Sequence, residues 1–232
     1  MCFLGANIKS ASSKLLVIAR MWDTTKRLLF TVDHWESHFV PALTRLGYSG
    51  VYKQRTGDDK RDGCALFYRV EKLSLLSHHA VEFCQPDMAV LDRDNVAVMA
   101  KFCHKNAGHH SKVALDIFVV CQCSLAKLYL FGSLQPFVVA TTHILFNKRR
   151  TDIKLSQLAV LLTDLDSFAR EEGPSGSGHV PVILSGDFNM TPDSPIISNF
   201  VQGGVIDYRA HIHPIYRLPR NLGVCCIFSV QI

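Results

Sequence analysis

The feature that most limits the fold is a long helical pattern lying between two strand-like apolar runs. Residues 137–142 form a run rich in Val and Ala, and residues 180–184 form a second apolar run. Short apolar runs of this kind fit buried strands. Between them, apolar residues recur at helical spacing on one face, at Leu155, Leu158, Ala159, Leu162, Leu165 and Ala169.

The residues before this unit predict one more helix and several strands. Asp33 and Glu36 form an Asp variant of the capping box, apolar residues follow at helical spacing, and Gly47 ends the run. Strand-like runs then occupy residues 48–54, 64–70, 73–81 and 95–102, with a polar hairpin loop at 56–63. This order of elements predicts an α/β sandwich with mixed sheets.

Three segments stand apart from this pattern. Residues 1–32 show weak periodicity and form a divergent N-terminal segment before a domain at 33–232. Residues 103–135 are apolar but irregular, and a loop this long in a compact domain is unusual, so we expect an insertion there. Residues 171–178 are rich in Gly, Ser and Glu and predict a flexible link.

Composition narrows the class of protein. Hydrophobic residues make up 48% and charged residues 19%, which excludes wholesale disorder. The formal net charge of +5 is compatible with a polyanion such as RNA without requiring one. We find no apolar run long enough to span a bilayer and no signal sequence. We therefore expect a soluble intracellular protein, cytoplasmic or nuclear, with no membrane partner.

Polar side chains follow the two apolar runs at 137–142 and 180–184. His143 ends the first, and Asp187 and Asn189 follow the second after Gly186, which would let the backbone approach a ligand closely. If that strand continues, Asp187 and Asn189 point the same way. A carboxylate, an amide and an imidazole together suit phosphoester hydrolysis with Mg²⁺.

A plainer reading of these residues is open as well. Asp-x-Asn after a strand is often only a turn, and a lone histidine at a strand end is usually a satisfied surface or core group. The grouping of Cys103, His104, His109 and His110 fits no zinc template, so we expect a solvated loop there and assign no metal ligands.

Several motifs resemble one known family. Residues 185–195 resemble the Gly-Asp-Phe-Asn motif of the endonuclease/exonuclease/phosphatase superfamily, and residues 142–145 resemble its Thr-His-Leu motif. Residues 52–57, 62–65, 91–96 and 142–155 narrow the resemblance to the Angel proteins, relatives of the carbon-catabolite-repression deadenylases and nocturnin. The resemblance covers residues 33–102 and 136–226.

The resemblance implies a four-layer α/β sandwich, two packed mixed β-sheets with helices outside. It implies Mg²⁺-dependent hydrolysis (with Mn²⁺ as an alternative) of phosphoester bonds at RNA 3′ ends, either as a 3′-5′ exoribonuclease or deadenylase or as a 2′,3′-cyclic phosphatase. By motif match, Asp187 would orient and deprotonate the attacking water, and Asn189 and His143 would stabilise the phosphoryl group. Asn95 would lie near the same site and contact substrate, although its segment equally fits a turn.

The sequence also departs from the family pattern. The residues before Asp33 hold no carboxylate where the family places a metal-binding Glu, and the family's Ser-Asp-His triplet does not occur. We therefore expect a domain incomplete at both ends, with edge elements of its sheets missing.

Three hypotheses follow. The first is the RNA 3′-end hydrolase. The second is a catalytically impaired relative that binds RNA, or protein partners in mRNA metabolism, with Lys148, Arg149 and Arg150 contacting phosphates. The third is a fragment that does not fold alone. Nothing in the sequence indicates the oligomeric state.

Overall fold

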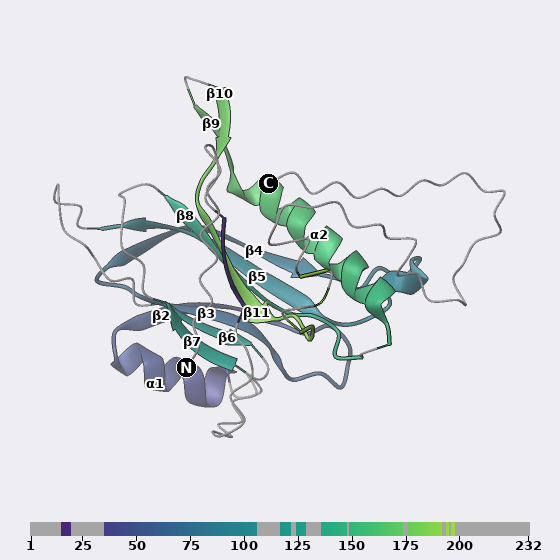
Figure 1. The fold of residues 1–232 in the computed structure, drawn as a ribbon. Coiled ribbons are helices and arrows are strands. Elements are labelled where there is room, and N and C mark those ends of the chain that lie inside the picture. Colours follow the sequence, from purple (N-terminus) through teal and green to yellow (C-terminus); the bar gives the residue numbers. More distant parts are fainter. Residues whose placement is uncertain are drawn as a thin grey trace.

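The computed structural model describes residues 15–19, 35–105, 117–121, 124–128, 136–147, 149–173, 176–191, 194 and 196–197. Two β-sheets lie face to face, with one helix on the outside of each (Figure 1). The first sheet has the strand order β1-β11-β8-β5-β4 and contains β1 (Leu15–Ala19), β4 (Leu73–Glu82), β5 (Val96–His104), β8 (Phe137–His143) and β11 (Val182–Asp187).

The second sheet has the order β2-β3-β6-β7 and contains β2 (Tyr48–Gln54), β3 (Gly63–Arg69), β6 (Ile117–Cys121) and β7 (Ser124–Leu128). Its described strands are all antiparallel. The first sheet is mixed, because β1, β11 and β8 run parallel while β5 and β4 are antiparallel to their neighbours.

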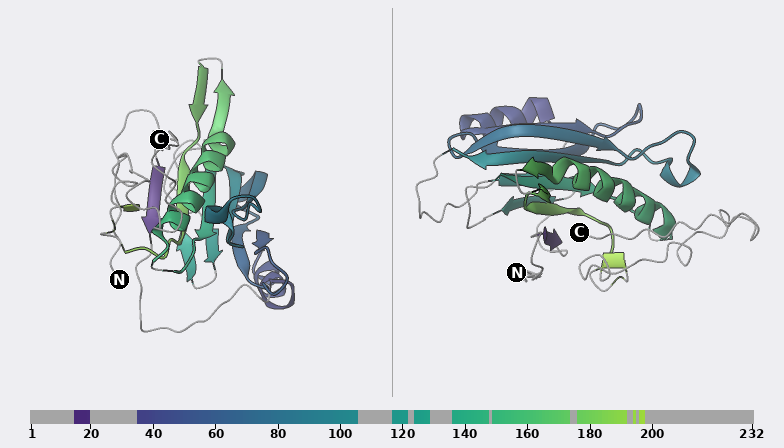
Figure 2. Two further views of the ribbon diagram at one scale, coloured as in Figure 1. Left: turned by 90° about the vertical axis from the view of Figure 1, so that its right-hand side faces the viewer. Right: turned by 90° about the horizontal axis from the view of Figure 1, so that it is seen from above.

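The alternation of side chains along the strands produces three apolar interfaces. Helix α2 (Thr151–Ala169) packs on the β8 and β11 residues that face away from the second sheet, such as Ala140 and Leu184. The intervening residues, such as Val139 and Ile183, pack between the sheets. The chain therefore forms a four-layer α/β sandwich, as predicted, and Figure 2 shows the helices on opposite sides of the stacked sheets.

The outer layer on the second sheet is helical from Trp35 onward. A π-helical turn, η2 (Trp35–Phe39), continues into α1 (Val40–Arg45), while the predicted N-cap Asp33 lies outside the described residues. Gly47 ends the helix as predicted. It adopts φ +78°, and its backbone N–H donates to the Thr44 carbonyl at 2.9 Å. Trp35 stacks on Tyr52 of β2 at 4.7 Å between ring centroids, which fixes this layer on the sheet.

The predicted flexible link at 171–178 is wrong for its described residues. They belong to an antiparallel pair, β9 (Arg170–Gly173) and β10 (Gly176–His179), which projects from the end of α2 (Figure 1). Asp166 forms an ion pair with Arg170 and contacts His179, both at 2.9 Å. Glycine and serine favour loops locally, but the ladder between the two strands holds an extended hairpin instead.

The segments 1–32 and 103–135 are described only in part. From the first, β1 pairs with β11 in the first sheet. From the second, β6 pairs with β3 and its Ile117 is fully buried, so part of this segment belongs to the second sheet. That 103–135 is an insertion stays a prediction. Within the described part of the chain, no helix is long and apolar enough to cross a membrane.

Candidate active site

The ends of β8 and β11 meet because these strands are parallel neighbours. Asp187 and His143 are register partners, and the backbone N–H of Ile144 donates to the Asp187 carbonyl at 2.9 Å. The alternation that puts Val139 and Ile183 between the sheets directs His143 and Asp187 toward the second sheet as well. Two residues 44 positions apart in the sequence thus share one edge and one face of a sheet.

Asn189 reaches the same place by a turn, so the condition of a continuing strand is not met and the alternative of a turn applies. Strand β11 ends at Asp187, and Asn189 adopts the left-handed conformation at φ +50°. Its backbone N–H donates to Asp187 Oδ1 at 2.9 Å, and its side-chain Nδ2 donates to the Ile144 carbonyl at 2.8 Å. Asn tolerates this conformation, and the Asp side chain stabilises the turn. The turn and the clustering of polar groups therefore occur together.

The structure gives a reason for the glycine at position 186 that differs from the expected close approach to a ligand. Its φ is +153°, and a Cβ there would overlap the Thr142 carbonyl oxygen and lie 2.9 Å from the Thr142 nitrogen. The close approach is therefore to the neighbouring strand β8, which holds His143 beside Asp187.

The imidazole of His143 is buried, with 8% of the residue exposed. Burial is the largest influence and lowers its pKa, the charge of Asp187 opposes this, and the charge of Arg55 lowers the pKa further. The neutral imidazole is therefore favoured at neutral pH. Its Nδ1 is buried and has no hydrogen-bond partner among the described residues.

Asn95 supports the backbone of His143 in this structure. Asn95 Nδ2 donates to the His143 carbonyl at 2.8 Å, and Asn95 Oδ1 accepts from Gln157 Nε2 at 3.1 Å. Gln157 Oε1 in turn accepts from the Leu145 backbone N–H at 3.0 Å. This chain of hydrogen bonds connects α2 to the end of β8 and fixes where His143 leaves the strand.

Two residues of α2 were not identified from the sequence. Gln157 is fully buried, and Lys154, which is not among the apolar residues of the predicted helix face, is 3% exposed and donates to the Asn189 carbonyl at 2.7 Å. Lys154 and Gln157 are three residues apart, so they share a face of the helix. This pair of polar residues near the helix start was the signal that could have identified them.

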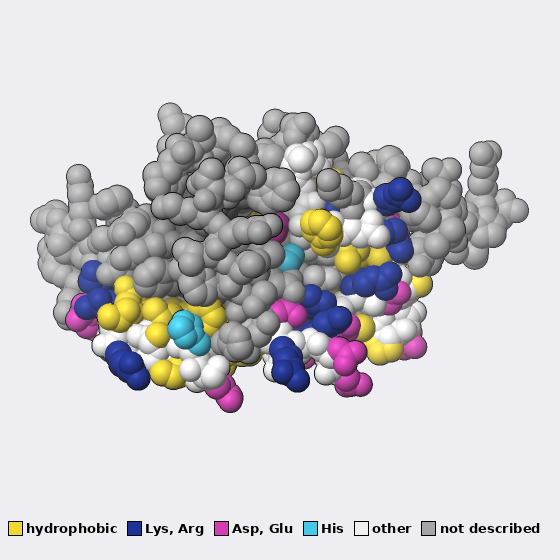
Figure 3. Space-filling model, turned by 90° about the horizontal axis from the view of Figure 1, so that it is seen from below, with side chains coloured by type: hydrophobic (Ala, Val, Ile, Leu, Met, Phe, Trp, Pro, Cys, Tyr) yellow, Lys and Arg dark blue, Asp and Glu magenta, His cyan; other side chains and the backbone are white. Residues whose placement is uncertain are grey.

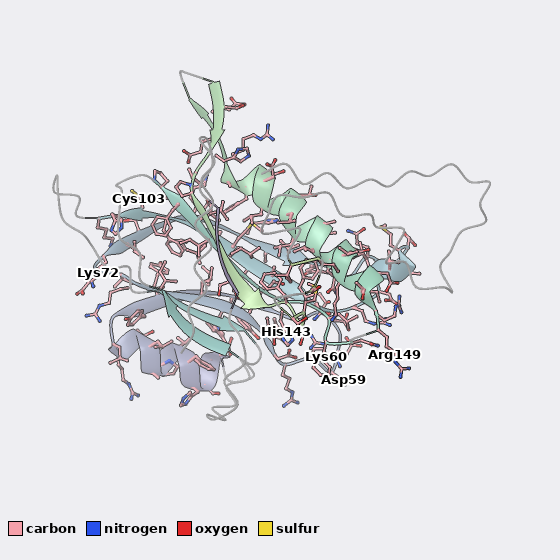
Figure 4. The ribbon with its side chains drawn as sticks, viewed as in Figure 1. Asp59, Lys60, Lys72, Cys103, His143 and Arg149 are labelled. Carbon is pink, nitrogen blue, oxygen red and sulfur yellow. The ribbon has the colours of Figure 1, made fainter. Side chains whose placement is uncertain are left out.

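Sequence analysis also did not identify Arg55 and Asp62, in the hairpin loop between β2 and β3, as site residues. Arg55 Nη1 and Asp62 Oδ2 lie 3.2 Å apart at the base of the loop. Their charges both act on the pKa of His143, in opposite directions. In the view of Figure 4 the loop residues Asp59 and Lys60 lie at the same end of the molecule as His143 and Arg149. The available signal was that Arg55 lies within the motif at 52–57 and Asp62 within the motif at 62–65.

The basic residues after β8 differ in their surroundings. Arg149 is exposed, whereas Arg150 makes two hydrogen bonds to the buried carboxylate of Asp152, both at 3.0 Å. Lys148 lies outside the described residues. Arg149 therefore offers a charge to a ligand, while the charge of Arg150 is compensated within the protein.

The described residues fit a divalent cation only in part. Asp187 supplies a carboxylate and Asn189 an amide oxygen, which are ligand types that Mg²⁺ takes. No group of three or more His, Cys, Asp or Glu side chains within the described ranges could hold a metal ion. This pair suits an ion held mainly by substrate and water, not a site built from the protein alone.

Four layers with polar groups gathered at adjoining strand ends define the class as an α/β sandwich with its site at the sheet edge. The chain belongs to the Endonuclease/Exonuclease/phosphatase family, whose sequence model matches residues 21–225. The resemblance seen in the motifs is therefore confirmed. Enzymes of this family are generally dependent on divalent metals.

Individual relatives are similar over most of this chain. Human protein angel homolog 2 is 35% identical over 217 residues, covering 86% of this chain and 35% of that protein. Human protein angel homolog 1 is 37% identical over 189 residues, covering 81% of this chain and 25% of that protein. The chain thus spans between a quarter and about a third of the length of these relatives.

A solved structure shares the fold. It is the crystal structure of ANGEL2, a 2′,3′-cyclic phosphatase, in complex with adenosine-2′,3′-vanadate. The TM-score is 0.58 at 38% sequence identity, and the match covers 75% of this chain and 41% of that chain.

Proposed function

We propose that this protein is a phosphoester hydrolase acting on RNA 3′ ends, of the exoribonuclease or 2′,3′-cyclic phosphatase type. The observation that carries the proposal is the meeting of His143, Asp187 and Asn189 at the paired ends of β8 and β11. A general base, an amide and a neutral imidazole around one point are the groups that hydrolysis of a phosphoester uses. Family membership and similarity to a 2′,3′-cyclic phosphatase support the reaction class.

Each side chain has a role that its surroundings support. Asp187 accepts a proton from the attacking water, and the Asn189 N–H bonded to its Oδ1 holds the carboxylate in one orientation. His143, kept neutral by burial, donates a hydrogen bond to a phosphoryl oxygen as charge develops there. Asn95 acts through His143, because its amide is bonded to the His143 carbonyl and to Gln157.

We propose Mg²⁺ as the cofactor, with Mn²⁺ as the alternative, held mainly by substrate and water, with Asp187 and Asn189 as the described residues that would bind the water molecules of the ion. A bound cation there would supply positive charge against the phosphoryl oxygens. The thermal unfolding midpoint, measured at increasing concentrations of Mg²⁺, tests this without catalysis. The midpoint should rise with Mg²⁺ for the natural chain and should not rise for Asp187→Ala.

An RNA terminus fits the surroundings of the site. Arg149 is exposed, and Phe146 is 69% exposed three residues beyond His143. Cationic side chains contact phosphates and flat aromatic faces stack on bases. We include Lys148 among the phosphate-contacting residues and place the protein in the cytoplasm or nucleus as part of the same proposal.

The test is cleavage of labelled RNA that ends either in an A-tract or in a 2′,3′-cyclic phosphate. Replacing Asp187 with Asn removes the base and should lower turnover at least about 100-fold. The matched control is Asp164→Asn, the same change on α2, where the carboxylate contacts His79 and should leave turnover unchanged. Equal turnover by Asp187→Asn and the natural chain would contradict this site, and no turnover of either RNA would contradict the function.

A further inference from the structure

Three buried polar side-chain atoms in the described part of the chain lack a hydrogen-bond partner, and all three belong to residues on or next to strands of the two facing sheets. They are Nε of Arg55, Oγ1 of Thr141 and Nδ1 of His143. Thr141 and His143 are two residues apart on β8, and Arg55 directly follows β2 in the facing sheet. Buried polar groups are nearly always paired, and each exception needs an explanation, such as a catalytic role or a bound water, ion or ligand.

The base of the β2–β3 loop holds Arg55 at this place. The Arg55 backbone N–H donates to the Asp62 carbonyl at 2.8 Å, and the two side chains form the ion pair described above, with 20% and 11% of their surface exposed. The next residue, Thr56, donates to Asp94 at 3.1 Å. Asp94 precedes Asn95, which is bonded to the His143 carbonyl, so the loop is docked on the strand end that supports His143.

The ion pair engages only part of the guanidinium. Arginine carries five N–H donors in a flat fork, and Asp62 accepts from Nη1, which leaves Nε without an acceptor. The charges of Arg55 and Asp62 both reach the imidazole, so the fork and His143 belong to one electrostatic site. Figure 3 shows Lys and Arg side chains gathered at this end of the molecule, interspersed with acidic ones.

We propose that Arg55 binds the terminal phosphate of the RNA substrate, with Nε donating to a phosphoryl oxygen opposite His143. This inference rests on the proposed function and names the group by which the site recognises a phosphorylated 3′ end. A phosphate suits the position because its oxygens match the guanidinium fork and accept charge-assisted hydrogen bonds. Asp62 then acts as a positioning residue that keeps the fork in place.

The experiment compares binding of two fluorescent RNA oligonucleotides, one ending in a 3′-phosphate and one in a 3′-hydroxyl, by anisotropy without added metal. The natural chain should bind the 3′-phosphate RNA roughly tenfold more tightly, because one charge-assisted hydrogen bond is gained. Arg55→Gln should reduce this preference to about one while leaving the affinity for the 3′-hydroxyl RNA unchanged. Arg45→Gln, the same charge change on the exposed face of α1, should keep the preference.

Arg55→Lys is a second variant in case Arg55→Gln does not fold, which circular dichroism would detect. It keeps the charge but not the fork, and it should lose most of the preference while retaining the fold. The inference is overturned if Arg55→Gln, or the folded Arg55→Lys, keeps the full preference, or if the natural chain has none. A natural chain that binds neither RNA contradicts the proposed function and this inference together. Binding of both RNAs with a preference that survives in the Arg55 variants contradicts the inference alone.

Discussion

Replacing Gln157 with leucine should destabilise the protein by about 2–5 kcal/mol. Gln157 is fully buried in α2 and makes two hydrogen bonds, one to the segment that follows His143 and one to Asn95. Its Oε1 accepts from the Leu145 N–H at 3.0 Å, and its Nε2 donates to Asn95 Oδ1 at 3.1 Å. Leucine has a similar volume, so the change removes both bonds without opening a large cavity.

The size of the loss in stability follows from the two groups that lose their hydrogen-bond partner, the Leu145 N–H and Asn95 Oδ1. Each buried donor or acceptor that loses its partner costs about 1–3 kcal/mol, and the added apolar surface of leucine offsets a small part of the sum. Asn95→Leu should cost a similar amount. The double variant should cost less than the sum of the two, because the second change removes the acceptor that the first had left unpaired.

Urea unfolding followed by circular dichroism measures these differences. Thr163→Ala is the matched control on the same helix, because it removes one exposed hydrogen bond to the Ala159 carbonyl and should shift stability by no more than about 0.5 kcal/mol. A Gln157→Leu protein as stable as the control would refute the reasoning. Strictly additive effects of the Gln157 and Asn95 changes would refute the network.

Two further outcomes are expected. Gly186→Ala should destabilise the chain by several kcal/mol, because a Cβ at this position, where φ is +153°, overlaps the Thr142 backbone. Urea unfolding measures the change. Unchanged stability would mean that the parallel pairing of β8 and β11 tolerates a side chain there. Stability should also fall as the pH is lowered through about 6.5 and toward the depressed pKa of folded His143. The folded pKa of His143 lies below its unfolded value of about 6.5, so the unfolded chain binds the proton first and the contribution is complete only above that value. Burial lowers the pKa of His104 as well, so His143→Asn should reduce this dependence on pH without removing it. An equal slope in the variant would contradict the burial of the imidazole.

Sequence reasoning anticipated most of the elements. The predicted strand at 48–54 matches β2, the run at 73–81 lies within β4, and the run at 95–102 overlaps β5 from Val96 onward. These successes share a cause, since apolar periodicity and capping signals act over a few residues and are visible locally. The hairpin at Arg170–His179 was missed because its ladder outweighs the loop preference of its glycines and serines.

The sequence by itself determined which side chains end the apolar strands and which family they resemble. Motif identity and local periodicity are sufficient for both. Only the tertiary structure decided that His143 lies in register with Asp187, that Gln157 reaches Asn95, and that Arg55 approaches from the facing sheet. These contacts depend on strand order and on the packing of one sheet on the other, which are set by the whole set of pairings and cannot be read from any short segment.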